Sequence, residues 1–559
     1  MKKYLFLAIA LLGLVSCTND DIADGNNPIH GGEVETSYIA INLNAADITR
    51  AEGGAYQEGL EAERAVKAAY FFFFDDKGDA FPVTATAGNP ATGPELGGSV
   101  NWISANLNNV GKEMDNVSDI KDAVLVLSTY EGTYPAQIVA VLNWVPTASE
   151  AYDLEDLYAA TAIQGTEGGF VMSNAVYSDG TKAVVGTPLT ASDIYTSPAD
   201  ALANPITIHV ERIAAKITVT ANGVKDNRFQ IQKKTGDAVS IPLDGNDTEV
   251  YVQVTGWELY NDFTESKLLK EIDPTWDEMA LGFTWNDKPF YRSYWAESLP
   301  LSAITDNAFP TSFGLKLGSA ANVTAGTYAD DTYTYVGENT NYVVNNTNDC
   351  TKVIIKAKLQ KKIDDETFED LKLARWYATY YADLDDLLTA VANTIKYQYY
   401  WYDETNKKYV YIAPEDLTVK KVDNWVAFTL SSVAMGKNWF IRNGDTYTAK
   451  TKEEINDLLD DIEKALYYDE AETLYYVDIK HLGNGTDNAH KAGDYGVVRN
   501  HIYNVVLNSF GGLGSPVYIP GGNLVYPNDP LDTGEYVSAE VRVLSWRLVD
   551  QVVDIQPNN

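Results

Sequence analysis

Short runs of alternating hydrophobic and polar positions recur along most of this chain, with turn residues between them. In 38–43, Ile39, Ile41 and Leu43 share one face of a predicted strand. The segment 68–74 is apolar throughout, which predicts a strand buried on both faces. Many short strands separated by turn signals are typical of β-sandwiches. The pattern therefore predicts a mainly β protein.

Helical spacing of apolar residues interrupts this β pattern in a few places. It predicts surface helices at 149–161, 383–395 and 451–466. The last of these opens with a capping box, formed by Thr451 and Glu454. Further strands are predicted at 137–142, 169–175, 206–220, 250–260, 352–359, 397–402, 408–412, 474–479 and 497–508.

A second isolated strand lies near the far end of the chain, at 536–544, after a Pro/Gly-rich stretch at 511–530. One face carries Val537, Ala539, Val541 and Val543, and Trp546 follows. A final hairpin strand would need only a short turn, and an unpaired apolar strand promotes aggregation. We therefore expect this tail to be donated to the sheet of another copy of the chain. The alternative is a last strand folded into its own domain.

The first residues read as a lipoprotein signal. Lys2 and Lys3 precede an apolar stretch too short to span a bilayer, and the stretch ends at Cys17 in a sequence that resembles a bacterial lipobox. Cys17 is therefore the predicted lipidation site, with an ordinary cleaved signal as the alternative. Thr18 to Asp21 resemble the acidic tag of lipoproteins that reach the cell surface in Bacteroidota.

Arg50 lies in a polar, Gly-flanked segment, as proteolytic sites typically do. A cut between Arg50 and Ala51 would remove the lipid anchor together with the strand that carries Ile39. Losing that strand would open a groove that the tail could fill. Arg64 is a rival site, but cleavage there would open a predicted core strand; Arg50 as a plain loop arginine is the other alternative.

The length of the chain predicts more than one domain, because 559 residues are too many for one core. The predicted segments are a signal peptide at 1–17, a propeptide with the removable strand at 18–50, an N-terminal domain at 51–224, a C-terminal domain at 225–510, a linker at 511–535 and a donor-strand tail at 536–559.

Composition limits the classes of partner and site that the protein could have. The net charge of −37 argues against nucleic acid, which requires a basic surface. Besides Cys17 only Cys350 is present, so a disulfide framework and a cysteine-rich metal site are excluded. The 37 Tyr and 11 Trp residues favour strands.

The chemistry-bearing residues do not form a catalytic pattern, so no enzyme activity, metal or cofactor is expected. His481 and His490 flank a loop and could meet, but a zinc site there is the weaker interpretation. The turn at 75–79 lacks the alternating ligands of a calcium loop. Neither a nucleophile elbow nor a phosphate loop is found. The carboxylate pairs 385–386 and 460–461 indicate solvated helix faces, although a glycosidase dyad stays open.

One aromatic cluster leaves two interpretations open. It comprises Tyr397, Tyr399, Tyr400, Trp401 and Tyr402. These rings could form a platform on which sugars stack. Core packing and cross-strand pairing is the favoured interpretation.

An ordered set of segments resembles a known family. After Cys17 and Arg50, it comprises 210–219, 498–506, 511–514 and 541–546. Together they resemble the major shaft fimbrillins of Bacteroidales type V pili, in the short-fimbria, Mfa-type branch. The resemblance implies two transthyretin-like Greek-key β-sandwich domains and an extended C-terminal donor strand.

The resemblance also implies a function. The precursor would be an outer-membrane lipoprotein, and an Arg-specific surface protease would cut after Arg50. The protein would then polymerise by strand exchange into a cell-surface fimbria that supports adhesion and biofilm formation, with other copies and with anchor and tip fimbrillins as partners. The alternatives are a surface-anchored glycan-binding lipoprotein, a tip or accessory fimbrillin, and a surface hydrolase.

Overall fold

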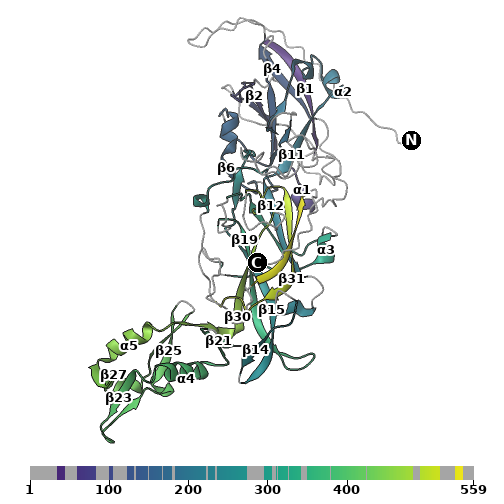
Figure 1. The fold of residues 1–559 in the computed structure, drawn as a ribbon. Helices are drawn as coiled ribbons and strands as arrows, with labels where there is room; N and C mark the ends of the chain where they lie inside the picture. Colours follow the sequence, from purple (N-terminus) through teal and green to yellow (C-terminus); the bar gives the residue numbers. More distant parts are fainter. Residues whose placement is uncertain are drawn as a thin grey trace.

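The chain folds into three bodies in a row (Figure 1). The computed structural model describes residues 34–44, 60–83, 100–104, 123–130, 134–148, 150–166, 168–178, 183–221, 225–232, 236–243, 245–273, 295–304, 310, 312–324, 327–341, 349–377, 379–422, 425–481, 492–516 and 536–545. We call the three bodies the N-terminal unit, the central unit and the inserted unit. Cys17, Arg50, Ala51, His490 and Trp546 lie outside the described residues.

The N-terminal unit is built on one sheet with the strand order β3-β2-β5-β7-β11-β1-β4, and β10 pairs with β5. Its strands are β1 (Val34–Asn44), β2 (Ala69–Phe74), β3 (Trp102–Ser104), β4 (Ala123–Tyr130), β5 (Gln137–Leu142), β7 (Met172–Asn174), β10 (Thr187–Pro188) and β11 (Ile206–Arg212). Phe71 and Phe73 contribute to the core on one face, and Phe72 and Phe74 to the core on the other. The predicted strand buried on both faces is therefore confirmed.

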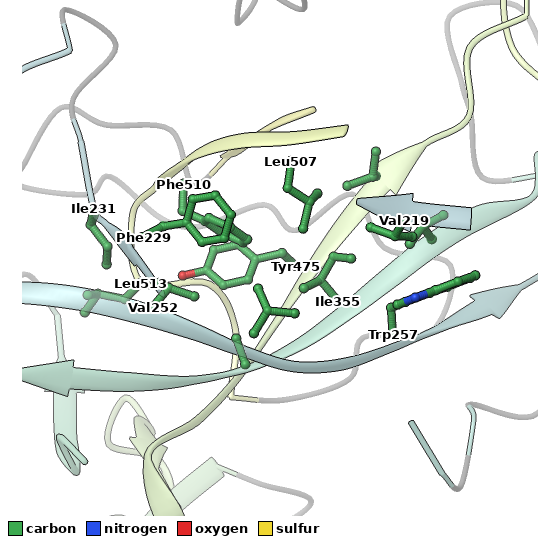
Figure 2. Packing of buried hydrophobic residues seen from close by; sticks show 14 of the residues in the cluster. Val219, Phe229, Ile231, Val252, Trp257, Ile355, Tyr475, Leu507, Phe510 and Leu513 are labelled. Atoms are coloured by element: carbon green, nitrogen blue, oxygen red, sulfur yellow. The ribbon is translucent and has the colours of Figure 1, made fainter. Parts of the chain in front are cut away.

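The central unit is a sandwich of two sheets around the largest core. One sheet holds β12 (Ala214–Ala221), β17 (Gly318–Ser319), β18 (Tyr333–Gly337), β31 (His501–Gly511) and β32 (Tyr536–Ser545). The other holds β13 (Arg228–Gln230), β14 (Ser240–Leu243), β15 (Asn246–Tyr260), β19 (Lys352–Lys362), β20 (Phe368–Asp370) and β30 (Glu472–Asp478). Val219 and Leu507 from the first sheet meet Val252 and Ile355 from the second in the same core (Figure 2).

The inserted unit leaves the central sandwich after β20 and returns before β30. It has its own core, between Ala374 and Ala465 in the sequence. One sheet holds β21 (Leu373–Trp376), β22 (Thr379–Tyr381), β25 (Leu417–Val422), β26 (Trp425–Leu430) and β29 (Ala465–Tyr468); the other holds β23 (Tyr399–Asp403), β24 (Lys408–Tyr411), β27 (Trp439–Asn443) and β28 (Thr446–Lys450). Figure 1 shows this unit projecting from the lower end of the central unit.

Small elements complete the fold. Two short strand pairs, β6 (Ala160–Ala162) with β16 (Glu265–Lys267) and β8 (Tyr177–Ser178) with β9 (Ala183–Val184), lie outside these sheets. The helices are α1 (Glu61–Arg64), α2 (Pro198–Ala203), α3 (Ala320–Thr324), α4 (Leu384–Ile395) and α5 (Lys452–Asp460). No helix in the described ranges is long and apolar enough to cross a membrane.

The helix predictions hold in part. α4 matches its prediction, and its N-cap Asp383 accepts a hydrogen bond from the Asp386 N–H. α5 begins after the predicted cap, Thr451, but ends at Asp460. The predicted continuation to 466 is wrong, because Leu466 pairs with Arg375 and Trp425 as part of β29. The helical spacing at 149–161 corresponds to a single 3-10 helix, Leu154–Tyr158.

The mainly β architecture is confirmed. The chain passes from the N-terminal sheet to the central one between β11 and β12, one strand before the predicted boundary at 224. β31 runs through Gly511, so the predicted linker begins inside a strand.

Candidate strand-exchange site

The predicted removable strand, β1, lies inside the N-terminal sheet. It pairs in parallel with β11, where Ile41 lies opposite Ile206 and Leu43 opposite Ile208. On its other side it pairs antiparallel with β4 from Val34 to Ile41. The ladder to β4 therefore holds the first part of β1 and the ladder to β11 its last four residues, and the two ladders overlap at Ile41. Without β1, the hydrogen-bonding edges of β11 and β4 would lose their partner.

The core also depends on β1. Ile39 is fully buried, in the same cluster as Phe71 and Phe73. Ile208 of the neighbouring strand belongs to this cluster as well. Helix α2 packs beside β1, as Figure 1 shows. Removal of β1 would thus expose apolar surface along with the two strand edges.

The predicted donor strand, β32, pairs antiparallel with β31 of its own chain. Val537 lies opposite Phe510, Ala539 opposite Leu507, Val541 opposite Val505 and Val543 opposite Tyr503. These four β31 residues are all fully buried in the central core. The predicted apolar positions of the tail are thus in backbone register with core residues of β31.

This pairing is the alternative considered for the tail, a last strand within its own domain. β32 stands at the end of the strand order β17-β12-β31-β32. It is therefore held by one ladder, whereas β1 is held by two. Donation to a neighbouring copy stays a prediction.

Three hydroxyl groups hold the chain between β31 and the tail. The Thr473 hydroxyl donates to the Leu513 carbonyl at 2.6 Å, Tyr475 to Gly512 at 3.1 Å and Tyr468 to Gly514 at 2.9 Å. Gly514 has φ +68°, and a Cβ there would come within 2.3 Å of the Thr473 hydroxyl oxygen. Only glycine fits this turn without strain. The 511–514 motif therefore anchors the start of the tail segment to β29 and β30.

Three buried ion pairs were not predicted from the sequence. Two of them join the N-terminal and central units, and the third, Arg499–Glu338, lies within the central unit. The pairs are Lys216–Glu63 at 2.8 Å, Lys270–Glu211 at 3.1 Å and Arg499–Glu338 at 3.0 Å, all between side chains at most 1% exposed. The sequence contains an indication of such pairs, because a charged residue inside an apolar strand, such as Lys216 in β12, is typical of a buried ion pair. The partner of Lys216 could not be predicted, since Glu63 lies far away in the sequence.

Several side chains surround the ion pair of Lys216 and Glu63. Tyr335 donates a hydrogen bond to Glu63, and the Lys216 ammonium lies 3.4 Å from the ring centroid of Tyr328. Arg212 donates from Nε to the Glu63 carbonyl at 2.7 Å. Burial lowers the pKa of Lys216, although Glu63 acts in the opposite direction. The same burial raises the pKa of Tyr328 and of Tyr335.

The other residues considered for metal binding or catalysis make structural contacts or lie on exposed helix faces. His481 is buried, with Nδ1 2.9 Å from the Tyr503 hydroxyl oxygen. No cluster of three His, Cys, Asp or Glu residues that could hold a metal occurs within the described ranges. The 75–79 segment is a turn in which Asp75 accepts hydrogen bonds from the Lys77 and Asp79 N–H groups. The carboxylate pairs at 385–386 and 460–461 are exposed, as predicted.

The aromatic cluster divides between two faces of one sheet. Tyr399 and Trp401 contribute to the core of the inserted unit. Tyr400 is buried, and Tyr397 is 62% exposed. Core packing thus accounts for part of the cluster and cross-strand pairing for another part, as the favoured interpretation predicted.

Comparison with known proteins identifies the tail region. Residues 466–551 match the family described as major fimbrial subunit protein type IV, fimbrillin, C-terminal. The C-terminal part of this chain is therefore similar to the C-terminal region of fimbrillins. The match spans β29, β30, β31 and β32, which include the predicted donor strand and its partner. The predicted resemblance to fimbrillins is confirmed.

Solved structures similar to this chain share little sequence with it. A candidate cell adhesion protein from Parabacteroides distasonis is 13% identical, with 92% of this chain and 98% of that chain covered and a TM-score of 0.37. A fimbrilin from Porphyromonas gingivalis is 12% identical, with 92% and 98% covered and a TM-score of 0.32. The tip fimbrial protein Mfa3 from Porphyromonas gingivalis is 11% identical, with 91% and 100% covered and a TM-score of 0.29. No curated protein matches.

Proposed function

We propose that this chain is a structural pilin subunit of a cell-surface fimbria, without catalytic activity, that polymerises by strand exchange and supports adhesion and biofilm formation. The observation that carries the proposal is the fimbrillin match over 466–551, which includes β32, a strand held by one ladder. The acceptor would be the place of β1, and the donor would be β32 of another copy.

The position of β1 in the sheet supports the acceptor side of the proposal. Removing a strand from inside a sheet leaves two unpaired edges, which readily accept another strand. Ile39, Ile41 and Leu43 alternate along β1, and Val537, Ala539, Val541 and Val543 alternate along β32. The same period of two would let the tail present an apolar side chain at each position that β1 vacates.

The attachment of the tail supports the donor side of the proposal. Leaving β31 would break one strand ladder and expose one edge. The chain is held up to Ser515, which is paired with Leu474. The swing would begin after that point, in 517–535. These 19 residues could span up to ~60 Å at about 3.3 Å per residue.

Processing and location complete the proposal. Acylation at Cys17 would anchor the precursor in the outer membrane. An Arg-specific surface protease would cut between Arg50 and Ala51 and release β1 with the anchor. Both ends of the proposed exchange would then be ready only at the cell surface. The shaft role in an Mfa-type pilus, with anchor and tip fimbrillins as partners, is part of this proposal.

Deletion of 536–559 tests the donor role. The central core reaches only to Leu513 among the described residues before the tail, so we expect a folded monomer that forms no fibres after proteolytic removal of 1–50. Circular dichroism and thermal unfolding would report folding, and electron microscopy would report fibres. Deletion of only 556–559 is the matched control and should assemble. Fibres from the tail-deleted protein would show that the tail is not the donor.

A further inference from the structure

The β24-β23-β27-β28 sheet of the inserted unit has one covered face and one open face. Tyr399, Trp401, Trp439 and Ile441 contribute to the inner core. Residues of α4 and α5, such as Leu387 and Ile455, lie in that same core. Both helices therefore pack on the inner side. The alternate residues of the four strands form the outer face.

The outer face is almost entirely aromatic. Paired residues share a face, and Tyr400 lies opposite Tyr411 and Phe440, Tyr402 opposite Tyr409, and Arg442 opposite Tyr447. We call this surface the tyrosine face; it comprises Tyr400, Tyr402, Tyr409, Tyr411, Phe440, Arg442, Tyr447 and Ala449, with Tyr397 at its edge. It contains no aliphatic side chain larger than alanine.

The rings form a connected and ordered layer. The Tyr409 and Tyr447 rings stack at 3.8 Å with an interplanar angle of 5°. Tyr400 lies 4.9 Å from Tyr411 and 5.1 Å from Tyr447, measured between ring centroids. Tyr397 meets the edge of Tyr411 at 5.6 Å. Rings that already support one another lose little freedom when a ligand arrives.

Three tyrosines of this layer are exposed to solvent. Tyr397 is 62% exposed, Tyr411 46% and Tyr409 37%. Exposed large apolar side chains gathered in one patch indicate a binding surface. Tyrosine suits such a surface because its ring offers an apolar area and its hydroxyl a hydrogen-bonding group.

Charge distinguishes between ligands. Arg442 is the one charged side chain among the outward positions of these four strands, all of which the structure describes. Its guanidinium lies 3.6 Å from Asp445 and donates to the Gly444 carbonyl at 2.7 Å. At the edge, the Lys396 ammonium lies 5.3 Å from the ring centroid of Tyr397. The face itself thus carries little net charge within a chain of net charge −37. An anionic ligand would find little attraction here.

We propose that the tyrosine face binds a neutral carbohydrate chain. The C–H faces of pyranose rings would lie against Tyr397, Tyr411 and Tyr409. The phenolic hydroxyls and the Arg442 N–H groups would bond to sugar hydroxyls. A tyrosine-rich face also occurs in protein interfaces, and a contact with another protein chain is the outcome that the sedimentation measurement below separates. This binding site is independent of strand exchange and would be present in the monomer.

Affinity electrophoresis of the unpolymerised full chain tests the site. The probes are soluble neutral polysaccharides (mixed-linkage β-glucan, xyloglucan, galactomannan and dextran) and one acidic polymer, polygalacturonate. We expect at least one neutral polymer to retard the protein. The double variant Tyr397→Ala/Tyr411→Ala should bind it roughly tenfold more weakly.

A matched control separates the face from tyrosine content in general. Tyr377 is 63% exposed and lies outside the tyrosine face, and its φ of 51° suits asparagine. Tyr377→Asn should bind as the unaltered chain does, and all variants should unfold at similar temperatures. The proposal is overturned by no retardation with any neutral polymer, by retardation with polygalacturonate alone, or by equal binding of the double variant. It is equally overturned if the double variant changes only the sedimentation of the chain, which would mark a contact between copies.

Discussion

At the residue scale, the pair of Glu63 and Lys216 is the most consequential contact between the N-terminal and central units. Both side chains are fully buried. A buried ion pair contributes little net stability over an apolar pair, but removing one partner leaves an uncompensated charge in the interior. The pair therefore makes the position of α1 on the central unit specific. It also holds the chain just after the proposed cleavage site.

Glu63→Ala should destabilise the protein by about 3–5 kcal/mol, because the Lys216 charge loses its carboxylate. The double variant Glu63→Leu/Lys216→Met should recover most of that loss. Glu404→Ala, which breaks the exposed Lys407–Glu404 pair, should cost less than about 1 kcal/mol. Urea unfolding measures all three. Equal costs for Glu63→Ala and Glu404→Ala would contradict the assignment.

Buried tyrosines make alkaline pH destabilising. Burial raises the pKa of Tyr158 to about 12, and raises the pKa of Tyr328, Tyr335, Tyr495 and Tyr503 as well. The unfolded chain loses these protons near pH 10.0 while the folded chain keeps them. This stability is therefore fully present below pH 10 and is lost as the pH rises towards the folded values.

We expect the free energy of unfolding to fall between about pH 10.5 and 12, by up to about 1.4 kcal/mol per pH unit for each retained proton. Lys216 and Lys480 act oppositely only below their unfolded pKa of 10.5, since burial lowers their folded pKa. Urea midpoints across this range, with tyrosinate absorbance, give the measurement. Tyr158→Phe should flatten the slope; an unchanged slope would show that Tyr158 titrates normally.

At the element scale, the inserted unit has a narrow connection to the central unit. Leu373 and Tyr468 are paired and belong to the central core, whereas Ala374 and Ala465 belong to the inserted core. The chain thus crosses from one core to the other within a single antiparallel pair. An element that leaves and returns at neighbouring residues can be removed without stretching the rest of the chain.

Replacing 375–466 by Asn-Gly should leave a folded protein, because Ala374 and Tyr467 are paired and a two-residue turn can join them. The shortened chain should unfold cooperatively and still assemble, but should not bind carbohydrate. Calorimetry, electron microscopy and affinity electrophoresis report the three properties. A non-cooperative transition would mean that the central core depends on the inserted unit.

At the scale of the whole molecule, Arg50 and Arg64 are not equivalent protease sites. Arg64 ends α1, and its neighbour Glu63 is held through its side chain by Lys216 and through its carbonyl by Arg212. Proteases need an extended, accessible backbone, and burial with hydrogen bonding removes it. A cut after Arg64 would also separate Glu63 from the mature chain.

Arg50→Ala should therefore trap the lipidated precursor and abolish fibres, while Arg64→Ala should be processed and assemble normally. N-terminal sequencing of protein sheared from the cells distinguishes the two, with a start at Ala51 expected for the unaltered chain. A blocked start at Cys17 would favour a permanently anchored lipoprotein. Normal fibres from the Arg50→Ala variant would show that another site is used.

Local patterns were enough to predict many elements. The apolar run at 68–74, the strands β19, β23 and β24, and the capped start of α5 could all be predicted from their own residues. The candidate site was predictable to the same degree: β1 and β32 both exist as strands. The prediction that the α5 helix continues to 466 failed, because Leu466 pairs in a sheet with Arg375, which is far away in the sequence.

The sequence by itself determined which segments are strands and which face of each is apolar, because side-chain alternation is a local property. Only the tertiary structure decided which strands are neighbours. It placed β1 between two strands, β32 at an edge on β31, and Glu63 against Lys216. It also gave the inserted unit its own core and an open tyrosine face. Partner choice depends on contacts between residues far apart in the chain, and no local pattern encodes them.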